Sequence, residues 1–330
     1  RRFGPFFWTQ FLGAGNDNVY KNALIIFVAF HAAAHSAYDA NTLVNVAAGV
    51  FILPFVILSA TAGQLADKYE KSRLIRLVKL FEIAIMVVGA AGFWLQDLTL
   101  LFAALALMGV HSTLFGPVKY AILPQHLKPE ELIGGNGLVE MGTFVAILLG
   151  TIAGGVVVAI PGYGPVLAGL VAVAVAIAGW LVSRGIPHTP AVAPDLVLNW
   201  NPFTETSVNL KVPHRDAAVF NSIVGISWLW FFGSIFLTSF TPYARENLGG
   251  GEGVVTFLLA VSGDETVVTL CLAVFCIGIG AGSMLCERRS RRRVEIGLVP
   301  LGSIGMTVFA VDLHFASVAF APMNDATVMQ

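Results

Sequence analysis

The sequence predicts an all-α membrane protein, and three observations lead to this fold class. Hydrophobic residues make up 56% of the 330 residues, charged residues only 12%, and the mean hydropathy is +0.79. A soluble domain carries about 25% charged residues. The apolar residues gather in segments long enough to cross a bilayer as a helix, which takes about 20 residues. Lys and Arg gather in every second connection between these segments.

Nine apolar segments follow one another, at residues 6–30, 42–66, 73–95, 98–122, 136–160, 165–186, 218–240, 266–285 and 295–313. We expect each of them to form a transmembrane helix. Basic residues precede the first segment and occur in the connections 67–72, 123–135, 187–217 and 286–294. The other connections hold none, apart from Arg245 in 241–265. Because positively charged loops stay in the cytoplasm, we predict a cytoplasmic N-terminus.

The first segment contains a polar cluster made of Asn16, Asp17, Asn18 and Lys21. A charge in the hydrocarbon costs about 2.5–3.5 kcal/mol on insertion scales, so a charge inside the membrane needs a reason. We expect these side chains to line a cavity between helices and to bind the substrate. Asp17 and Lys21 lie four residues apart on one helix face and could instead neutralise each other. The sequence leaves both interpretations open.

The connection between the second and third segments reads GQLADK at residues 63–68, with Arg73 shortly after it. At a helix end, Asp67 can accept hydrogen bonds from the N-terminus of a neighbouring helix and pair with a cation. Gly63 would let another helix approach closely. We therefore predict a gate made of Gly63, Asp67, Lys68 and Arg73, and the alternative is an ordinary solvated loop.

Three further ionisable side chains inside the membrane are candidates for substrate binding: Glu82, Lys119 and Glu140. Glu82 stands three residues after Lys79, so the two could neutralise each other on one helix face. Lys79 also lies near the cytoplasmic end and could instead reach toward that interface. Lys119 follows Gly116-Pro117, a pair that kinks or ends a helix. Together with the first segment, these residues would give the cavity both signs of charge. Such a cavity suits a zwitterionic amphiphile with a phosphate and an amine.

Two features of the middle segments are less specific. His111 in the fourth segment is either a hydrogen-bonded core residue, which is the commoner role, or a proton relay. Gly150 and Gly154 in the fifth segment have the spacing of a close helix contact. We expect these two glycines to pack against another helix rather than to bind substrate.

Residues 188–217 interrupt the hydropathy because they are polar and rich in Pro and Asn, so we predict a cytoplasmic linker there. The predicted domains are an N-terminal six-helix bundle at 1–187, this linker, and a partial C-terminal bundle at 218–330 with the last three segments. This layout resembles the two-bundle fold of the major facilitator superfamily, whose six-helix halves enclose a central cavity. About nine of an expected twelve transmembrane helices would be present. The run at 63–68 also resembles the cytoplasmic signature of that superfamily.

Several strings resemble the bacterial lysophospholipid transporter family within this superfamily. They are QFLGA at 10–14 leading into Asn16–Asn18 and KNAL at 21–24, GQLADK at 63–68, FGPVKY at 115–120, NWNPF at 199–203, and CER at 286–288 with VEIGLVP at 294–300. The similarity is closer to the transporter domain that many bacteria fuse to a lysophospholipid acyltransferase and an acyl-carrier-protein ligase.

This resemblance implies a function, a location and partners. A member of the family would flip lysophospholipids, chiefly lysophosphatidylethanolamine, to the inner leaflet of the bacterial inner membrane. There an acyltransferase or acyl-carrier-protein ligase system, fused or separate, would restore the diacyl lipid. The resemblance makes Asp17, Asn18 and Lys21 headgroup ligands and makes Asp67 with Arg73 the gate. The expected partners are the lysophospholipid, membrane lipids and that acyltransferase, without nucleic acid, metal or cofactor.

Two other classes of function remain to be weighed. A drug or small-molecule ion-coupled antiporter of the same superfamily would export its substrate when an acid such as Glu82 is protonated. A membrane-embedded acyltransferase would need a His with an Asp five residues on, the His acting as the base. The nearest match, His35 with Asp39, is one residue short. We therefore expect a transporter without catalytic residues.

Overall fold

The computed structural model describes residues 2–28, 40–211, 216–246, 264–290 and 297–319, and the connection that holds His35 and Asp39 lies outside them. Helices make up the regular structure of these ranges. The chain forms two compact units, Arg1–Arg215 and Asp216–Gln330. The domain division predicted from the sequence, with its linker at 188–217, stays a prediction.

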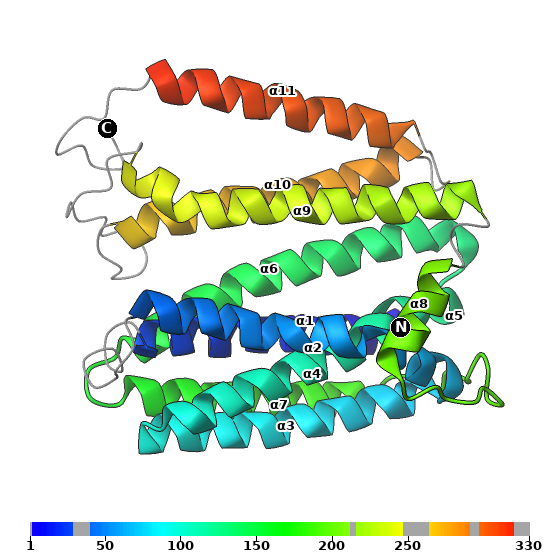
Figure 1. Cartoon of the computed structure of the whole chain (residues 1–330), viewed down its shortest axis with the longest axis horizontal. Helices are drawn as coiled ribbons and strands as arrows, with labels where there is room; N and C mark the ends of the chain where they lie inside the picture. Colours follow the sequence, from blue (N-terminus) through cyan, green and yellow to red (C-terminus); the bar gives the residue numbers. More distant parts are fainter. Residues whose placement is uncertain (1, 29–39, 212–215, 247–263, 291–296, 320–330) are drawn as a thin grey trace. The chain divides into compact units, whose positions relative to one another are not determined.

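The described part of the first unit holds six long helices that lie lengthwise beside one another (Figure 1). They are α1 (Phe3–Phe27), α2 (Ala40–Lys68), α3 (Lys71–Leu95), α4 (Leu98–Ala121), α6 (Leu132–Val158) and α7 (Gly164–Ser183). α1 packs against α6 and α7, α3 packs against α4 and α7, and α2 packs against α4. The short helix α5 (Leu123–His126) and a 3-10 turn (Pro129–Glu131) join α4 to α6, and α8 (Pro202–Lys211) follows α7.

Acidic side chains determine where two of these helices begin. α3 begins at Lys71, and the Glu70 carboxylate accepts the backbone N–H groups of Ser72 at 3.0 Å and Arg73 at 2.7 Å. Asp97 caps α4 in the same way. A carboxylate at this position satisfies N–H groups that have no partner inside the helix, and it also interacts favourably with the helix dipole.

An apolar core holds α1 against α3 and α4. Tyr20, Phe27 and Phe93 are buried in it, and T-shaped ring pairs join Phe93 to Tyr20 at 5.6 Å and to Phe27 at 5.7 Å. The Tyr20 hydroxyl donates to the Leu101 carbonyl at 2.9 Å. Because a buried hydroxyl needs such a partner, this contact also fixes the register of α1 against α4.

Glycines bring α1 and α6 into backbone contact. A Cβ at Gly154 would meet the carbonyl oxygen of Val19 at 2.5 Å, and a Cβ at Gly150 would collide with the backbone of Gly15. The predicted packing role of Gly150 and Gly154 is therefore confirmed. The backbones of the two helices approach closely here, as small residues permit.

The second unit contains α9 (Ala217–Glu246), α10 (Asp264–Ser290) and α11 (Leu298–Ala319), and α9 packs against α10. The nine long helices of the described ranges coincide with the nine apolar segments of the sequence, with ends that differ by a few residues. Six of the helices are long and apolar enough to cross a membrane by length and composition alone. The two first-unit helices outside those six, α1 and α3, carry charged residues in their interiors.

Candidate functional site

A buried polar cluster joins α1, α3 and α4. Its members, called the Glu82 cluster below, are Asn16, Lys79, Glu82 and His111, and each residue is at most 2% exposed. The Lys79 ammonium lies 2.5 Å from Oε2 of Glu82, and Nδ2 of Asn16 donates to Oε1 at 2.8 Å. Both carboxylate oxygens of Glu82 therefore have a partner, and α1 is tied to α3 through Asn16.

The position of Lys79 decides between the two alternatives that the sequence left open, because it pairs with Glu82 and does not reach toward the interface. Lys79 is 1% exposed, and Gly13 of α1 makes room for it. A Cβ at Gly13 would overlap the Lys79 ammonium, and a Cβ at Gly179 would lie 3.7 Å from it. The ammonium also lies 5.4 Å from the centroid of the Phe115 ring. Lys79 is thus enclosed in the bundle as the counter-ion of Glu82.

Asp17 and Lys21 do not form the ion pair that their spacing allowed. Oδ2 of Asp17 accepts a hydrogen bond of 2.7 Å from the hydroxyl of Ser112 on α4. The Lys21 ammonium lies over the ring of Phe51 on α2, 4.5 Å from its centroid. Within the described ranges, no ion pair links the two residues. Lys21 is half-buried, whereas Oδ1 of Asp17 is buried and has no hydrogen-bond partner among the described residues.

A second polar group, called the Lys119 cluster, lies where α1, α4 and α6 meet. Its members are Gln10, Lys119, Tyr120, Glu140 and Thr143. Lys119 donates to the Thr143 hydroxyl at 2.8 Å, and that hydroxyl lies 3.0 Å from Oε1 of Gln10. The Tyr120 hydroxyl donates to the Glu140 carboxylate. α4 runs on to Ala121 with Pro117 inside it, so the Gly-Pro pair does not end this helix. Continued helix is what places Lys119 beside α6.

The remaining predicted ligand, Asn18, is satisfied within its own helix. Its amide donates to the carbonyl of Ala14 at 2.7 Å, and its Cβ would lie 3.1 Å from a Cβ at Gly150. The predicted binding residues therefore fall into separate places rather than one cavity wall. Asn16 and Glu82 lie in the Glu82 cluster, Lys119 and Glu140 lie in the Lys119 cluster, and Asp17 and Lys21 contact α4 and α2 separately.

The predicted gate residues lie at the connection between α2 and α3. The side chains of Asp67 and Arg73 are exposed, and Lys68 is half-buried. The backbone carbonyl of Asp67, rather than its carboxylate, accepts hydrogen bonds from Val192 at 3.0 Å and Ala193 at 2.9 Å. Among the described residues, a Cβ at Gly63 would meet no atom within 4 Å. The close helix approach expected at Gly63 is therefore not seen in the first unit.

Glu70 is a residue of this connection that the sequence did not single out. Besides capping α3, its carboxylate accepts the N–H of Thr189 at 2.7 Å. Burial by itself would raise the pKa of the Glu70 carboxyl, but hydrogen bonds from Ser72, Thr189 and Arg73 outweigh it and hold this pKa below its usual range. The sequence contained one signal for this role, because an acidic residue just before the apolar third segment stands where a helix N-cap is expected.

Residues 186–199, called the strap below, are bound across the ends of α2, α3 and α5. Lys71 donates its N–H to the carbonyl of Thr189 at 3.0 Å, and the His126 ring lies 2.7 Å from the Thr189 hydroxyl. Gln64 and the backbone of Asn199 exchange two hydrogen bonds, of 3.1 and 2.8 Å. These hydrogen bonds tie the strap to the first unit.

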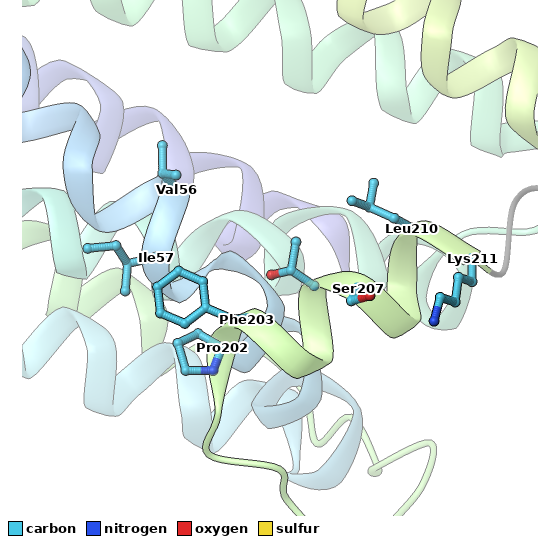
Figure 2. A pocket seen from close by; sticks show the side chains of 8 residues that line it. Val56, Ile57, Pro202, Phe203, Ser207, Leu210 and Lys211 are labelled. Atoms are coloured by element: carbon cyan, nitrogen blue, oxygen red, sulfur yellow. The ribbon is translucent and has the colours of Figure 1, made fainter.

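α8 follows the strap and lies along α2. The two helices border an apolar groove of about 480 Å³, in which Phe203 lies beside Ile57 (Figure 2). The groove is lined by Val56, Ile57, Pro202, Phe203, Thr206, Ser207, Leu210 and Lys211. None of the predicted binding residues lines it, so the groove is separate from both charged clusters. Among the described residues, no group of three His, Cys, Asp or Glu side chains is arranged to hold a metal ion.

Comparisons with known proteins are consistent with this architecture. Residues 6–328 match the family described as Major Facilitator Superfamily. The lysophospholipid transporter LplT of Enterobacter sp. (strain 638) is 31% identical over 92% of this chain and 70% of that protein. The proteins of that name from Serratia proteamaculans (strain 568) and Escherichia coli O1:K1 / APEC are 27% and 31% identical. The chain spans 61% and 52% of the lengths of those two relatives.

Solved structures show the same fold. The crystal structure of peptide transporter POT in complex with sulfate has a TM-score of 0.58 and 15% identity, over 89% of this chain and 70% of that one. A second structure of that transporter, in complex with alafosfalin, has a TM-score of 0.57. At this level of identity, the likeness concerns the fold alone.

The family match and these relatives test the fold class and the family resemblance that the sequence predicted. The predicted two-bundle fold class and the resemblance to lysophospholipid transporters are confirmed. A transporter rather than an enzyme agrees with the matched family. The chain is a multi-pass membrane protein, and it belongs to the Major Facilitator Superfamily.

Proposed function

We propose that this chain moves lysophosphatidylethanolamine-like lysophospholipids to the inner leaflet of the bacterial inner membrane by alternating access of its two bundles. Its N-terminus would lie in the cytoplasm. An acyltransferase or acyl-carrier-protein ligase, fused to the chain or separate, would then re-acylate the lipid. The relatives named as lysophospholipid transporters support this substrate class.

The single observation that carries the proposal is the Lys119 cluster. The Lys119 ammonium is half-buried and donates to a neutral hydroxyl, and no carboxylate lies at ion-pair distance from it among the described residues. Its charge is thus available for an anionic ligand such as a phosphate. Glu140 is held nearby through Tyr120 and offers a carboxylate for an amine. A phosphate and an amine on one small headgroup match this pair of charges.

The test is transport of labelled lysophosphatidylethanolamine into proteoliposomes, measured by albumin back-extraction of the lipid left in the outer leaflet. We expect Lys119→Ala to weaken transport roughly 10- to 100-fold, since a hydrogen bond to a charged group contributes about 1.5–3 kcal/mol. Lys128→Ala is the matched control, because Lys128 is exposed in the connection before α6. Equal transport by the two variants would refute the role of Lys119, and no transport by the unaltered protein would refute the substrate class.

A further inference from the structure

We propose that the groove between α2 and α8 binds an acyl chain of an anionic diacyl phospholipid from the surrounding membrane, with the lipid phosphate on Lys211. This lipid would stay in the groove and would not be the transported molecule. The proposal is therefore independent of the proposed function. Three features of the groove support it: the apolar walls, the membrane helix on one side, and the cation at one end.

The walls of the groove carry large apolar side chains that the described residues leave uncovered. Val56 of α2 is 72% exposed and Phe203 of α8 is 78% exposed, and both line the groove. Ile57 lies beside Phe203 (Figure 2). Exposed apolar patches of this kind mark contacts with a protein or with lipid. The volume of about 480 Å³ falls in the range of pockets that bind small molecules.

α2 brings one wall of the groove into the membrane. Its residues Thr42–Lys68 are long and apolar enough to cross a bilayer, and Val56 and Ile57 lie near the middle of this range. The other wall is different, because α8 has only ten residues and a mixed composition. Trp200, just before α8, is 69% exposed, and tryptophan is enriched where a membrane meets water. An apolar wall beside a mixed one suits an amphiphile, and the amphiphile that surrounds a membrane helix is lipid.

The cation at one end of the groove indicates which lipid fits. Lys211 is the last residue of α8, it is exposed, and it borders the groove. Among the described residues, no carboxylate lies at ion-pair distance from it. The single acid of α8, Glu205, lies 3.3 Å from the side-chain amide of Asn199 instead. A basic residue in the last turn also suits the helix dipole. Its position on an apolar groove is what assigns it a ligand.

The polar groups of the groove follow the order of groups in a phospholipid. Phe203 lies at the start of α8, the hydroxyls of Thr206 and Ser207 line its middle, and Lys211 stands at its end. An acyl chain, a glycerol with its ester groups and a phosphate come in the same order. An ammonium binds a phosphate well. The ammonium of a zwitterionic headgroup would add a like charge beside Lys211, so an anionic headgroup fits better.

The first experiment measures lipid binding to the purified, delipidated protein by native mass spectrometry. The probes are phosphatidylglycerol and phosphatidylcholine with identical acyl chains. We expect tighter binding of phosphatidylglycerol, and we expect Lys211→Ala to weaken it about tenfold or more, as the loss of a hydrogen bond to a charged group does. Lys128→Ala is the matched control, because Lys128 is exposed in the connection before α6. Equal binding of phosphatidylglycerol by the two variants would overturn the proposal.

A second variant tests the groove itself. Ser207→Trp places an indole in the groove, so binding of both lipids should fall, whereas Ser207→Ala should leave binding of the two lipids unchanged. Full binding by a folded Ser207→Trp would show that the acyl chain lies elsewhere. If Ser207→Trp does not fold, the comparison of Lys211→Ala with Lys128→Ala still decides, since both lysines are exposed.

Photolabelling in native membranes identifies what occupies the groove. With p-benzoylphenylalanine in place of Ser207, we expect an adduct with the mass of a diacyl phospholipid, and none with the same residue in place of Lys128. A crosslink to residues 217–319 or to a second copy of the chain would show that protein covers the groove and would overturn the proposal. An adduct with lysophospholipid alone would do the same. Neither experiment measures transport, so the lipid site and the proposed function can fail separately.

Discussion

At the scale of single residues, Glu82 is the predicted binding residue whose surroundings differ most from those of a side chain exposed in a cavity. Lys79 and Asn16 occupy its two oxygens, and all three side chains are buried. A substrate headgroup would have to displace one of these partners. Glu82 is therefore better described as a side chain that positions α1 against α3 than as a direct ligand.

The Lys79–Glu82 pair makes a prediction about stability. Removing one member leaves an unpaired buried charge, which costs about 3–5 kcal/mol, whereas replacing both with apolar side chains is often neutral. We expect Lys79→Met and Glu82→Leu each to lower the unfolding temperature strongly, and the double variant to recover most of the loss. The measurement is thermal unfolding in detergent, with the exposed Lys128→Met as the control. Additive losses in the double variant would show that the pair is not coupled.

The sequence could predict which residues in these helices are polar but not what they touch. The i,i+3 spacing allowed Lys79 and Glu82 to pair, and the structure bears this out. Whether Lys79 turns inward, however, depends on Gly13, which lies on another helix. Asn16 meets Glu82 across 66 residues of sequence, and a local pattern contains no information about such a contact.

At the scale of helices, the contact between α1 and α6 shows how the bundle is held together. Lipid provides no hydrophobic force between helices, so close backbone packing through small residues becomes the main stabilising interaction. Gly15, Gly150 and Gly154 supply this contact between α1 and α6. On the same pair of helices, the Thr143 hydroxyl of α6 lies 3.0 Å from Oε1 of Gln10 on α1, within the Lys119 cluster.

A single added methyl group tests this contact. In Gly154→Ala the new Cβ would meet the Val19 carbonyl oxygen at 2.5 Å, so one of the two helices must shift. Overpacking of this kind typically costs about 1–3 kcal/mol, and we expect the free energy of unfolding of Gly154→Ala to fall by about this amount. Gly49→Ala in α2 is the control, since a Cβ there meets no described atom within 4 Å. Alanine is the better helix former, so the control should be unchanged or slightly more stable in an unfolding titration.

Helix positions could be predicted well because a membrane span needs a long apolar segment. The strap and α8 could not. α8 has ten residues and a mixed composition, and the strap is bound by backbone groups and the amide of Gln64 rather than by an apolar pattern. A polar, proline-rich stretch gives the same hydropathy whether it is bound or free.

At the scale of the whole molecule, the distribution of basic residues makes a prediction about orientation. The connections with Lys and Arg alternate with connections that have none or one. Under the positive-inside rule, the α2–α3 connection would face the cytoplasm and the α6–α7 connection the outside. The two connections each carry an exposed tyrosine, Tyr69 at 47% and Tyr163 at 73%, which offers a matched pair of probe sites.

Cysteine labelling in intact cells can check this orientation. After Cys271, Cys276 and Cys286 are replaced by Ser, single cysteines are introduced as Tyr69→Cys and Tyr163→Cys. A membrane-impermeant maleimide added outside the cytoplasmic membrane should label Tyr163→Cys at once and Tyr69→Cys only after the membrane is permeabilised. The reverse pattern would contradict a cytoplasmic N-terminus, and with it the direction of lipid movement proposed above.

The strap also carries information about the order of events during synthesis of the chain. Glu70 meets Thr189 across 119 residues, and Gln64 meets Asn199 across 135. A ribosome makes the N-terminal partner of each pair long before the C-terminal one. These contacts can therefore form only after all six long helices of the first unit have been made. Docking of the strap would thus be a late event in the folding of the first unit.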